Sequence, residues 1–439
     1  MFSSLKKLFG KADTATDPVS ADTPASRPDG DSPFLRREPV FGKDNHLAGH
    51  LFRLQQSTAS ANADSVMQRD FDRVLLGTLN ASAETWNRSP AYIPISSTSL
   101  DLPVLEQLPS DKVVLLLQLA ADAEADIVCD AIAQLREREF QFGLFRQPKN
   151  PAYAKVIQKV DFAAIDIAAS EPNAIRDFSA AVRAGVQGNP IRLFACNVDT
   201  LDEHQLCLQW HFEHCHGKFA EQPADIQNAP AGDPHKTQLL NLLHLVQGDA
   251  ENAEIATAMK LDPVLSFRIL RYLNSPALAL TRRIDSLEQA LIILGRQKLT
   301  RWLAVLLFSV REPQLSDWLL IENALTRGRL MEVLGEQSMP GQHHDPLFLT
   351  GIFSCLDRLL RRPMADILHA MPIADEIRQA LLERSGPYAA LLAVAEAAEA
   401  VDQTAMASAA EAAGVTAESV NRALLAATAW ASEVTEYWE

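Results

Sequence analysis

Two hydrophobic patterns divide the chain. Between residues 34 and 223, short apolar runs alternate with longer segments of helical periodicity, which predicts strands alternating with helices. The predicted strands cover residues 47–54, 91–95, 113–119, 140–145, 162–167 and 191–196, and the predicted helices cover residues 65–80, 123–138, 173–184 and 202–210. This alternation is typical of βαβ units, so we predict an α/β fold with a mostly parallel sheet, closed as a compact eight-fold barrel.

Beyond residue 236 only the helical period remains. Asp262 reads as a helix N-cap because a proline follows it at the first helical position. Ser286 and Gln289 form a capping-box pattern, and Gly295 fits a C-cap. Further predicted helices cover residues 241–247, 254–260, 316–337, 346–360, 364–370, 374–384, 387–400, 404–413 and 416–435. The second half of the chain is therefore predicted to be all-helical.

Changes in composition mark the borders of these parts. Residues 12–33 are rich in Ala, Asp, Thr, Ser and Pro, and residues 224–236 form a short polar stretch with proline and glycine. We therefore divide the chain into a disordered tether (1–33), a barrel (34–223), a linker (224–236) and a helical domain (237–439). Residues 2–9 place apolar and basic side chains on opposite helical faces. So short a helix is marginal alone, and we expect a frayed start rather than contact with a membrane surface.

Cysteine content and net charge narrow the function. Five cysteines in 439 residues fit reduced thiols in a cytoplasmic protein better than a disulfide framework. No apolar run approaches the roughly 20 residues that span a bilayer. A net charge of −16 argues against broad nucleic-acid binding, because phosphate contacts need a clustered positive surface.

Basic side chains nevertheless cluster in one segment. Between Lys260 and Arg301 there are eight basic residues against three acidic ones. This basic island is either a solvated helix face or a docking surface for an acidic partner. The residues that we name as the partner-docking face are Arg268, Arg271, Arg282, Arg283, Arg296 and Arg301.

Two family resemblances organise these observations. The series DPVLSFRILRYLNSPA, IDSLEQALIILG and RQKLTRW resembles the signature of the HDOD domain, a helical relative of the HD phosphohydrolases that lacks their metal ligands. The stretch REPVFGKDNHLAGHLF resembles the opening of EAL domains, the barrels that hydrolyse cyclic di-GMP. The segments AYIPIS, VVLLLQL, FGLFRQ, FAAIDI, LFACNVDT and HCHGKF follow in the order of later EAL strand motifs. The chain thus resembles the bacterial signalling proteins that combine a degenerate EAL barrel with an HDOD domain.

Both resemblances imply lost active sites. EAL enzymes hold two divalent cations with acidic and amide side chains at strand ends, and a lysine helps to orient water. The family's catalytic positions fall on Leu51, Pro94, Gln118, Phe145, Arg146, Ala164, Cys196 and His216, which include no carboxylate. The arginine that grips the ligand falls near Gln55, with Arg53 as a shifted substitute, which argues against cyclic di-GMP binding. In the helical half, Arg327 and Ser354-Cys355 stand where HD enzymes place a histidine and the His-Asp pair.

One cluster of soft ligands invites a zinc hypothesis. Cys207 and His211 are four residues apart and share a helical face, and His214, Cys215 and His216 follow closely. A structural zinc site calls for paired ligands at shorter and repeated spacings. We therefore expect core or surface residues here, and no cofactor, although metal binding by these five residues stays an open alternative.

The sequence thus predicts a non-catalytic signalling adaptor or scaffold and not an enzyme. It would act through contacts with signalling proteins or with a second copy of itself, in the regulation of motility, biofilm or cyclic di-GMP. Two alternatives stay open. One is a cyclic di-GMP receptor that does not hydrolyse its ligand, and the other is a residual metal-dependent phosphodiesterase.

Overall fold

The computed structural model describes most of the chain after residue 32. The described residues are 33–55, 65–82, 89–185, 190–221, 234–248, 250–262, 265–267, 269–270, 284, 286–309, 315–369, 371–400 and 403–436. Four of the six predicted docking arginines, the N-terminal residues 2–9 and most of the predicted tether and linker lie outside them.

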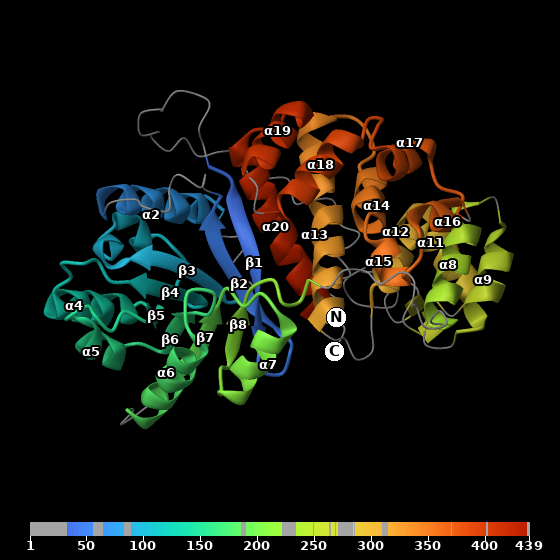
Figure 1. Ribbon diagram of the computed structural model, residues 1–439. Helices are drawn as coiled ribbons and strands as arrows, with labels where there is room; N and C mark the ends of the chain where they lie inside the picture. Colours follow the sequence, from blue (N-terminus) through green and yellow to red (C-terminus); the bar gives the residue numbers. More distant parts are fainter. Residues whose placement is uncertain are drawn as a thin grey trace.

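Eight strands close into a barrel in the order of the chain (Figure 1). They are β1 (Leu35–Gly42), β2 (Leu47–Leu54), β3 (Ala91–Ser96), β4 (Val113–Gln118), β5 (Gln141–Phe145), β6 (Phe162–Asp166), β7 (Arg192–Cys196) and β8 (His214–His216). Strands β2 to β8 are parallel, whereas β1 runs antiparallel to both of its neighbours, β2 and β8. The predicted barrel is confirmed, and its seven parallel strands all end at the same rim.

Helices and short turns connect the strands around the outside of the barrel. They are α2 (Ser65–Asn80), η2 (Ser97–Ser99), η3 (Pro103–Glu106), α4 (Ala125–Arg136), α5 (Tyr153–Val156), η4 (Ile157–Lys159), α6 (Pro172–Ala184) and α7 (Leu201–Gln209). Helix α7 begins with a complete capping box, in which Thr200 and Glu203 each accept a hydrogen bond from the other's backbone N–H. The four helices predicted for this half are confirmed to within a few residues at their ends.

The hydrophobic pattern did not predict the strand β1, and the reason is visible in the side chains that this strand carries. Both faces of β1 carry polar side chains. Arg37 points outward to a buried ion pair with the helical half, while Glu38 pairs with His216 of β8 inside the barrel. A strand that is polar on both faces lacks the apolar alternation that identifies a half-buried strand.

The second half of the chain is helical, as predicted. The described helices are α8 (Pro234–Gln247), α9 (Asn252–Lys260), α11 (Leu287–Leu294), α12 (Arg296–Leu307), α13 (Leu315–Ser338), α14 (Asp345–Phe353), α15 (Leu356–Leu360), α16 (Met364–His369), α17 (Asp375–Arg378) with the π-turn η7 (Gln379–Glu383), α18 (Ala389–Ala397), α19 (Gln403–Ala413) and α20 (Ala417–Glu436). The Ser286 hydroxyl accepts from the Gln289 N–H at 3.1 Å, and Gly295 ends α11 with φ 76°. The Ser286 N-cap and the Gly295 C-cap are therefore confirmed, although only this half of the predicted capping box is seen among the described residues. The single helix predicted over 346–360 is interrupted at Ser354 and Cys355.

The two halves are packed against each other through β1, β2, α13 and α20 (Figure 1). Arg37 of β1 donates to Glu322 of α13 at 2.5 Å, and His50 of β2 hydrogen-bonds the same carboxylate. The side chains of Arg37, Glu322 and His50 are 5%, 5% and 1% exposed. At the top of β1, the Leu35 N–H donates to Asn421 Oδ1 of α20 at 2.7 Å.

Candidate functional site

Polar side chains gather at the rim where the parallel strands end. The barrel interior is filled by Val40, Leu51, Tyr92, Val114, Leu116, Phe162, Ala164, Phe194 and Cys196. Because side chains alternate along a strand, the residue two positions after an interior residue also points inward. Arg53, Gln118 and Asp166 stand two positions after Leu51, Leu116 and Ala164, so they point into this mouth.

A cavity of about 550 Å³ opens at this end of the barrel. Its lining includes Arg53, Gln118, Arg146, Asp166 and Asn197, together with the flat side chains Phe71 and Phe145. Among the described residues, none forms a side-chain hydrogen bond or ion pair with Arg53 or with Arg146. The cavity therefore presents two guanidinium groups whose donors are available to a ligand.

A chain of hydrogen bonds runs along one side of the mouth. Asn197 Nδ2 donates to Asp166 Oδ2 at 2.9 Å, and the Asn197 backbone N–H donates to His216 Nδ1 at 3.4 Å. His216 Nε2 lies 3.1 Å from Glu38 Oε2, and Glu38 also pairs with Arg36. These contacts fix the positions of both carboxylates before any ligand binds.

The charge state of Glu38 follows from its neighbours. Burial raises the pKa of this carboxyl, but the contact with the His216 ring, together with the charges of Arg36 and Arg53, outweighs burial and brings the pKa to about 2. Glu38 is therefore ionised at neutral pH, and its charge is balanced by groups already present.

The described residues of the mouth do not fit a site for two divalent cations. Such ions need several free oxygen ligands. Asp72 accepts from the Ser96 N–H and the Ser99 hydroxyl, and Glu38 and Asp166 have the partners given above. Burial raises the pKa of Cys196 to about 12, so its thiol stays protonated. No group of three or more His, Cys, Asp or Glu side chains among the described residues is placed to hold a metal ion.

Seven of the eight positions aligned with the EAL catalytic set come together, and the eighth, His216, accepts from the backbone N–H of Asn197 beside them. Pro94, Gln118, Phe145 and Arg146 line the mouth cavity, and Leu51, Ala164 and Cys196 fill the interior beneath it. Of the two positions named for the ligand-gripping arginine, Arg53 lines the cavity, whereas Gln55 is 3% exposed and does not. Asp166 and Asn197 were not predicted as site residues. A polar residue at the end of a buried strand is the pattern that would have indicated them.

The five soft ligands of the zinc hypothesis point in different directions. His214 faces the barrel interior and stacks on Phe194, with ring centroids 6.1 Å apart. His216 pairs with Glu38, whereas Cys207 and Cys215 belong to a different apolar cluster outside the barrel. His211 is exposed and has φ 65°. Strand alternation separates His214 and His216 from Cys215, so the five side chains do not form one site.

The two described docking arginines both have partners within the chain, although Arg296 is exposed and only Arg301 is buried. Arg301 is 5% exposed and forms two hydrogen bonds to Glu332, at 2.5 and 2.8 Å. Arg296 donates to the backbone carbonyls of Gly248 and Ala250. The expectation that Arg301 belongs to an exposed docking face is therefore wrong, because its guanidinium is buried against a carboxylate. Arg268, Arg271, Arg282 and Arg283 lie outside the described residues.

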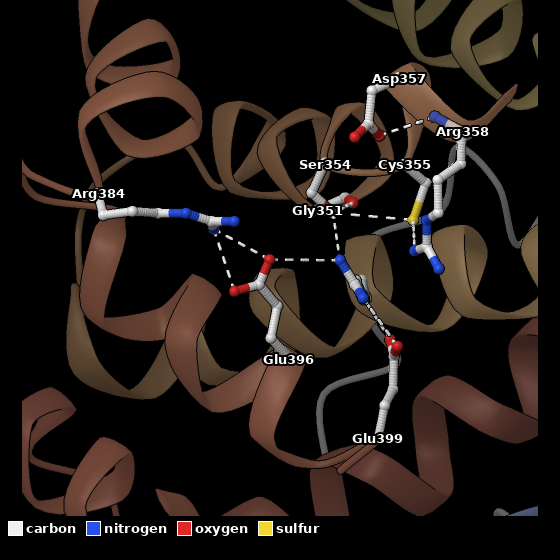
Figure 2. A network of polar contacts seen from close by, with 9 residues as sticks. Gly351, Ser354, Cys355, Asp357, Arg358, Arg384, Glu396 and Glu399 are labelled. Carbon is white, nitrogen blue, oxygen red and sulfur yellow. Dashed lines mark hydrogen bonds and ion pairs between the residues drawn. The ribbon is translucent and has the colours of Figure 1, made fainter. Parts of the chain in front are cut away.

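Figure 2 shows what occupies the positions aligned with the HD metal ligands. Arg327 of α13 donates to Glu399 at 2.5 and 2.8 Å and to the Ser354 hydroxyl at 3.0 Å. Arg358 donates to the Cys355 sulfur at 3.1 Å. Burial alone would lower the pKa of Arg327, but the charge of Glu399 more than compensates and raises it. A buried arginine paired with a glutamate therefore occupies the place where HD enzymes hold a metal cation.

These features define a barrel joined to a helical HDOD domain, and the comparisons with known proteins agree. Residues 236–364 match the family described as HDOD domain. The predicted fold class, an eight-stranded barrel followed by a helical HDOD region, is therefore confirmed.

Individual relatives cover more of the chain. It is 25% identical over 412 residues to the cyclic di-GMP phosphodiesterase CdgJ of Vibrio cholerae, which spans 91% of this chain and 93% of that protein. It is 30% identical over 198 residues to the uncharacterized protein YuxH of Bacillus subtilis, covering 44% of this chain and 48% of that one. Among solved structures it matches the Xanthomonas citri FimX EAL domain in complex with c-diGMP, with 12% identity and a TM-score of 0.34. The match covers 44% of this chain and 87% of that one.

The similarity to CdgJ corrects one prediction. From the strand-end residues alone, the chain was expected not to be an enzyme. A relative named as a phosphodiesterase that aligns over nine-tenths of the chain contradicts that expectation. Similarity over this length also supports a place in cyclic di-GMP signalling. Separately, none of the described helices is long and apolar enough to cross a membrane.

Proposed function

We propose that this protein works in cyclic di-GMP signalling and that the mouth of its barrel binds the dinucleotide. The observation that carries the proposal is that Arg53 and Arg146 line a cavity at the carboxyl ends of the strands, with no side-chain hydrogen bond or ion pair to another residue that the structure describes. Ligand sites of barrels of this type lie at that end.

The chemistry of the cavity suits this ligand. A cyclic dinucleotide carries two phosphodiester charges, and guanidinium groups bind phosphate oxygens with charge-assisted hydrogen bonds. Its purine bases need flat surfaces, which Phe71 and Phe145 offer. Gln118 and Asn197 add amide groups that can select among base edges.

Calorimetry with cyclic di-GMP and the full chain tests the proposal. Arg53→Ala and Arg146→Ala should each weaken binding by about 10- to 100-fold, the effect of losing a hydrogen bond to a charged group. The matched control is Arg183→Ala, an exposed arginine near the end of α6. If the wild-type chain takes up no cyclic di-GMP, or the control loses as much affinity as the mouth variants, the proposal is wrong.

A second candidate function is hydrolysis of cyclic di-GMP, favoured by the similarity to CdgJ over most of the chain. The full chain should be incubated with the dinucleotide and with Mg²⁺ or Mn²⁺, and the linear product measured by chromatography. Turnover that falls in Arg146→Ala and persists in Arg183→Ala supports hydrolysis at the mouth. Turnover that is equal in both variants would place the reaction elsewhere.

A further inference from the structure

A second and larger cavity, of about 1010 Å³, lies between the barrel and the helical domain. One wall comes from β1 and from the residues that follow β8. The other wall comes from α13, from α15 and the turn after it, and from α18. We call this cavity the interdomain cleft. The two cavities share no lining residue, although Glu38, which ends the row of contacts along the mouth, and its partner Arg36 line the interdomain cleft.

Several charges of the interdomain cleft are already neutralised. Arg36 pairs with Glu38, and Arg37 pairs with Glu322. Arg327, which also lines the cleft, pairs with Glu399. These pairs neutralise Glu38 and Glu399, and the lining as a whole holds eight basic side chains and five acidic ones.

A set of cations on both walls remains available. Lys218 follows β8 on the barrel side, and Arg361 and Arg362 follow α15 on the helical side. All three are exposed, and none has a side-chain hydrogen bond or ion pair with another described residue. Arg358, one turn before Arg361 and Arg362, donates a hydrogen bond to the Cys355 sulfur, which is a weak acceptor. The cleft is thus locally basic on a protein whose net charge is −16.

A buried donor in the same cleft also lacks an acceptor. Arg36 Nε is excluded from solvent and has no hydrogen-bond partner among the described residues, although the other end of the guanidinium meets Glu38. Unmet buried donors are costly, and a ligand oxygen would satisfy this one. Apolar side chains, including Leu319, Leu320 and Leu359, complete the lining.

We propose that the interdomain cleft is a second ligand site, which takes a phosphate-bearing molecule of nucleotide size. Guanidinium groups on one wall and an ammonium group on the other match a chain of phosphates, and the leucines match a base. The volume is at the upper end of the range of about 300 to 1,000 Å³ found for small-molecule pockets. This site is independent of the proposed cyclic di-GMP site, because its cations are different residues.

Calorimetry with ATP and GTP as probes, on the full chain, tests this inference. The double variant Arg361→Glu with Arg362→Glu should weaken binding of the probe at least about tenfold, because it reverses two of the proposed phosphate contacts. Lys218→Glu, on the opposite wall, should weaken it as well. Inorganic pyrophosphate should displace the bound probe, whereas adenosine or guanosine at equal concentration should not.

The matched control is Arg176→Glu with Arg183→Glu, which makes the same charge change on two exposed arginines of α6. It should bind the probe like the wild type. The inference is overturned if neither probe binds, if the α6 control loses as much affinity as the cleft variant, or if the nucleosides compete as well as pyrophosphate. Titration with cyclic di-GMP separates the two sites, since the cleft variants should keep that affinity and Arg146→Ala should lose it.

Discussion

The barrel mouth and the contact between the two halves both contain arginines, but they use them differently. In the mouth, Arg53 and Arg146 have no partner among the described residues. At the contact, Arg37 is buried against Glu322, and in the helical core Arg327 is buried against Glu399. An arginine therefore indicates a ligand site only where the fold leaves the N–H donors of its guanidinium without acceptors. Charge in the sequence cannot distinguish the two cases.

Among the substitutions that test this comparison, we expect Glu322→Ala to cause the largest loss of stability. Glu322→Ala leaves Arg37 and His50 buried without their acidic partner, which should reduce the free energy of unfolding by about 3–5 kcal/mol. Urea denaturation measures it. Glu336→Ala removes an exposed glutamate from the same helix and should change stability by less than about 0.5 kcal/mol. A loss below about 1 kcal/mol in Glu322→Ala would show that the pair does not hold the halves together.

The next effect is a loss of stability in acid. The charges of Arg37 and His50 outweigh the burial that raises the pKa of Glu322 and bring it to about 2, and Glu38 has a pKa of about 2 as well. Both pKa values are depressed, so the stabilisation is complete above the ordinary carboxyl pKa. It is lost as the pH falls from about 4.5 toward 2, by about 3 kcal/mol for each group. Unfolding measured across this range should show the fall, and Glu322→Gln should make it shallower than Glu336→Gln does.

A smaller loss is expected in the helical core. Glu399→Gln removes the charge that faces Arg327 but keeps a hydrogen-bonding oxygen, and Glu396 lies 3.5 Å from the same guanidinium. The side chain of Glu399 is also 22% exposed. We expect a loss of about 1–2 kcal/mol by urea denaturation. The exposed Glu411→Gln on α19 is the control, and equal effects in both would argue against the pair.

The smallest effect is expected in the mouth. Arg53→Ala and Arg146→Ala should change the free energy of unfolding by less than about 0.5 kcal/mol, because neither side chain forms a hydrogen bond or ion pair with a described residue and the charge of Glu38, which Arg53 helps to balance, keeps His216 and Arg36 as partners. Thermal unfolding without ligand measures this. A loss above 1.5 kcal/mol would mean that the arginines are structural, like Arg327, and the contrast between the two regions would disappear.

The fold was largely readable from the sequence because local rules decide most of it. Strand β2 and helix α2 were predicted at their observed bounds, since apolar alternation and helical period set them directly. The break at Ser354 and Cys355 was not predicted, because it depends on hydrogen bonds made there. The Ser354 hydroxyl donates to the Gly351 carbonyl at 2.6 Å and accepts from Arg327.

The sites were harder to predict because they depend on partners distant in sequence. The aligned positions Gln118 and Arg146 were placed correctly at the strand ends. Arg301 was taken for a surface residue because Glu332, which buries its charge, is 31 positions away. Asp166 and Asn197 can be recognised as site residues only in the folded chain, where β6, β7 and β8 bring them beside His216 and Glu38.

Hydrogen exchange measured with and without cyclic di-GMP tests the central claim most directly, because it locates the ligand on the full chain. We expect protection in the segments that follow β4 and β5, around residues 118–121 and 145–150, and little change in α13 and α15. This protection should vanish in Arg53→Ala with Arg146→Ala. Absence of protection at the strand ends, or protection confined to α13 and α15, would contradict the assignment of the barrel mouth as the cyclic di-GMP site.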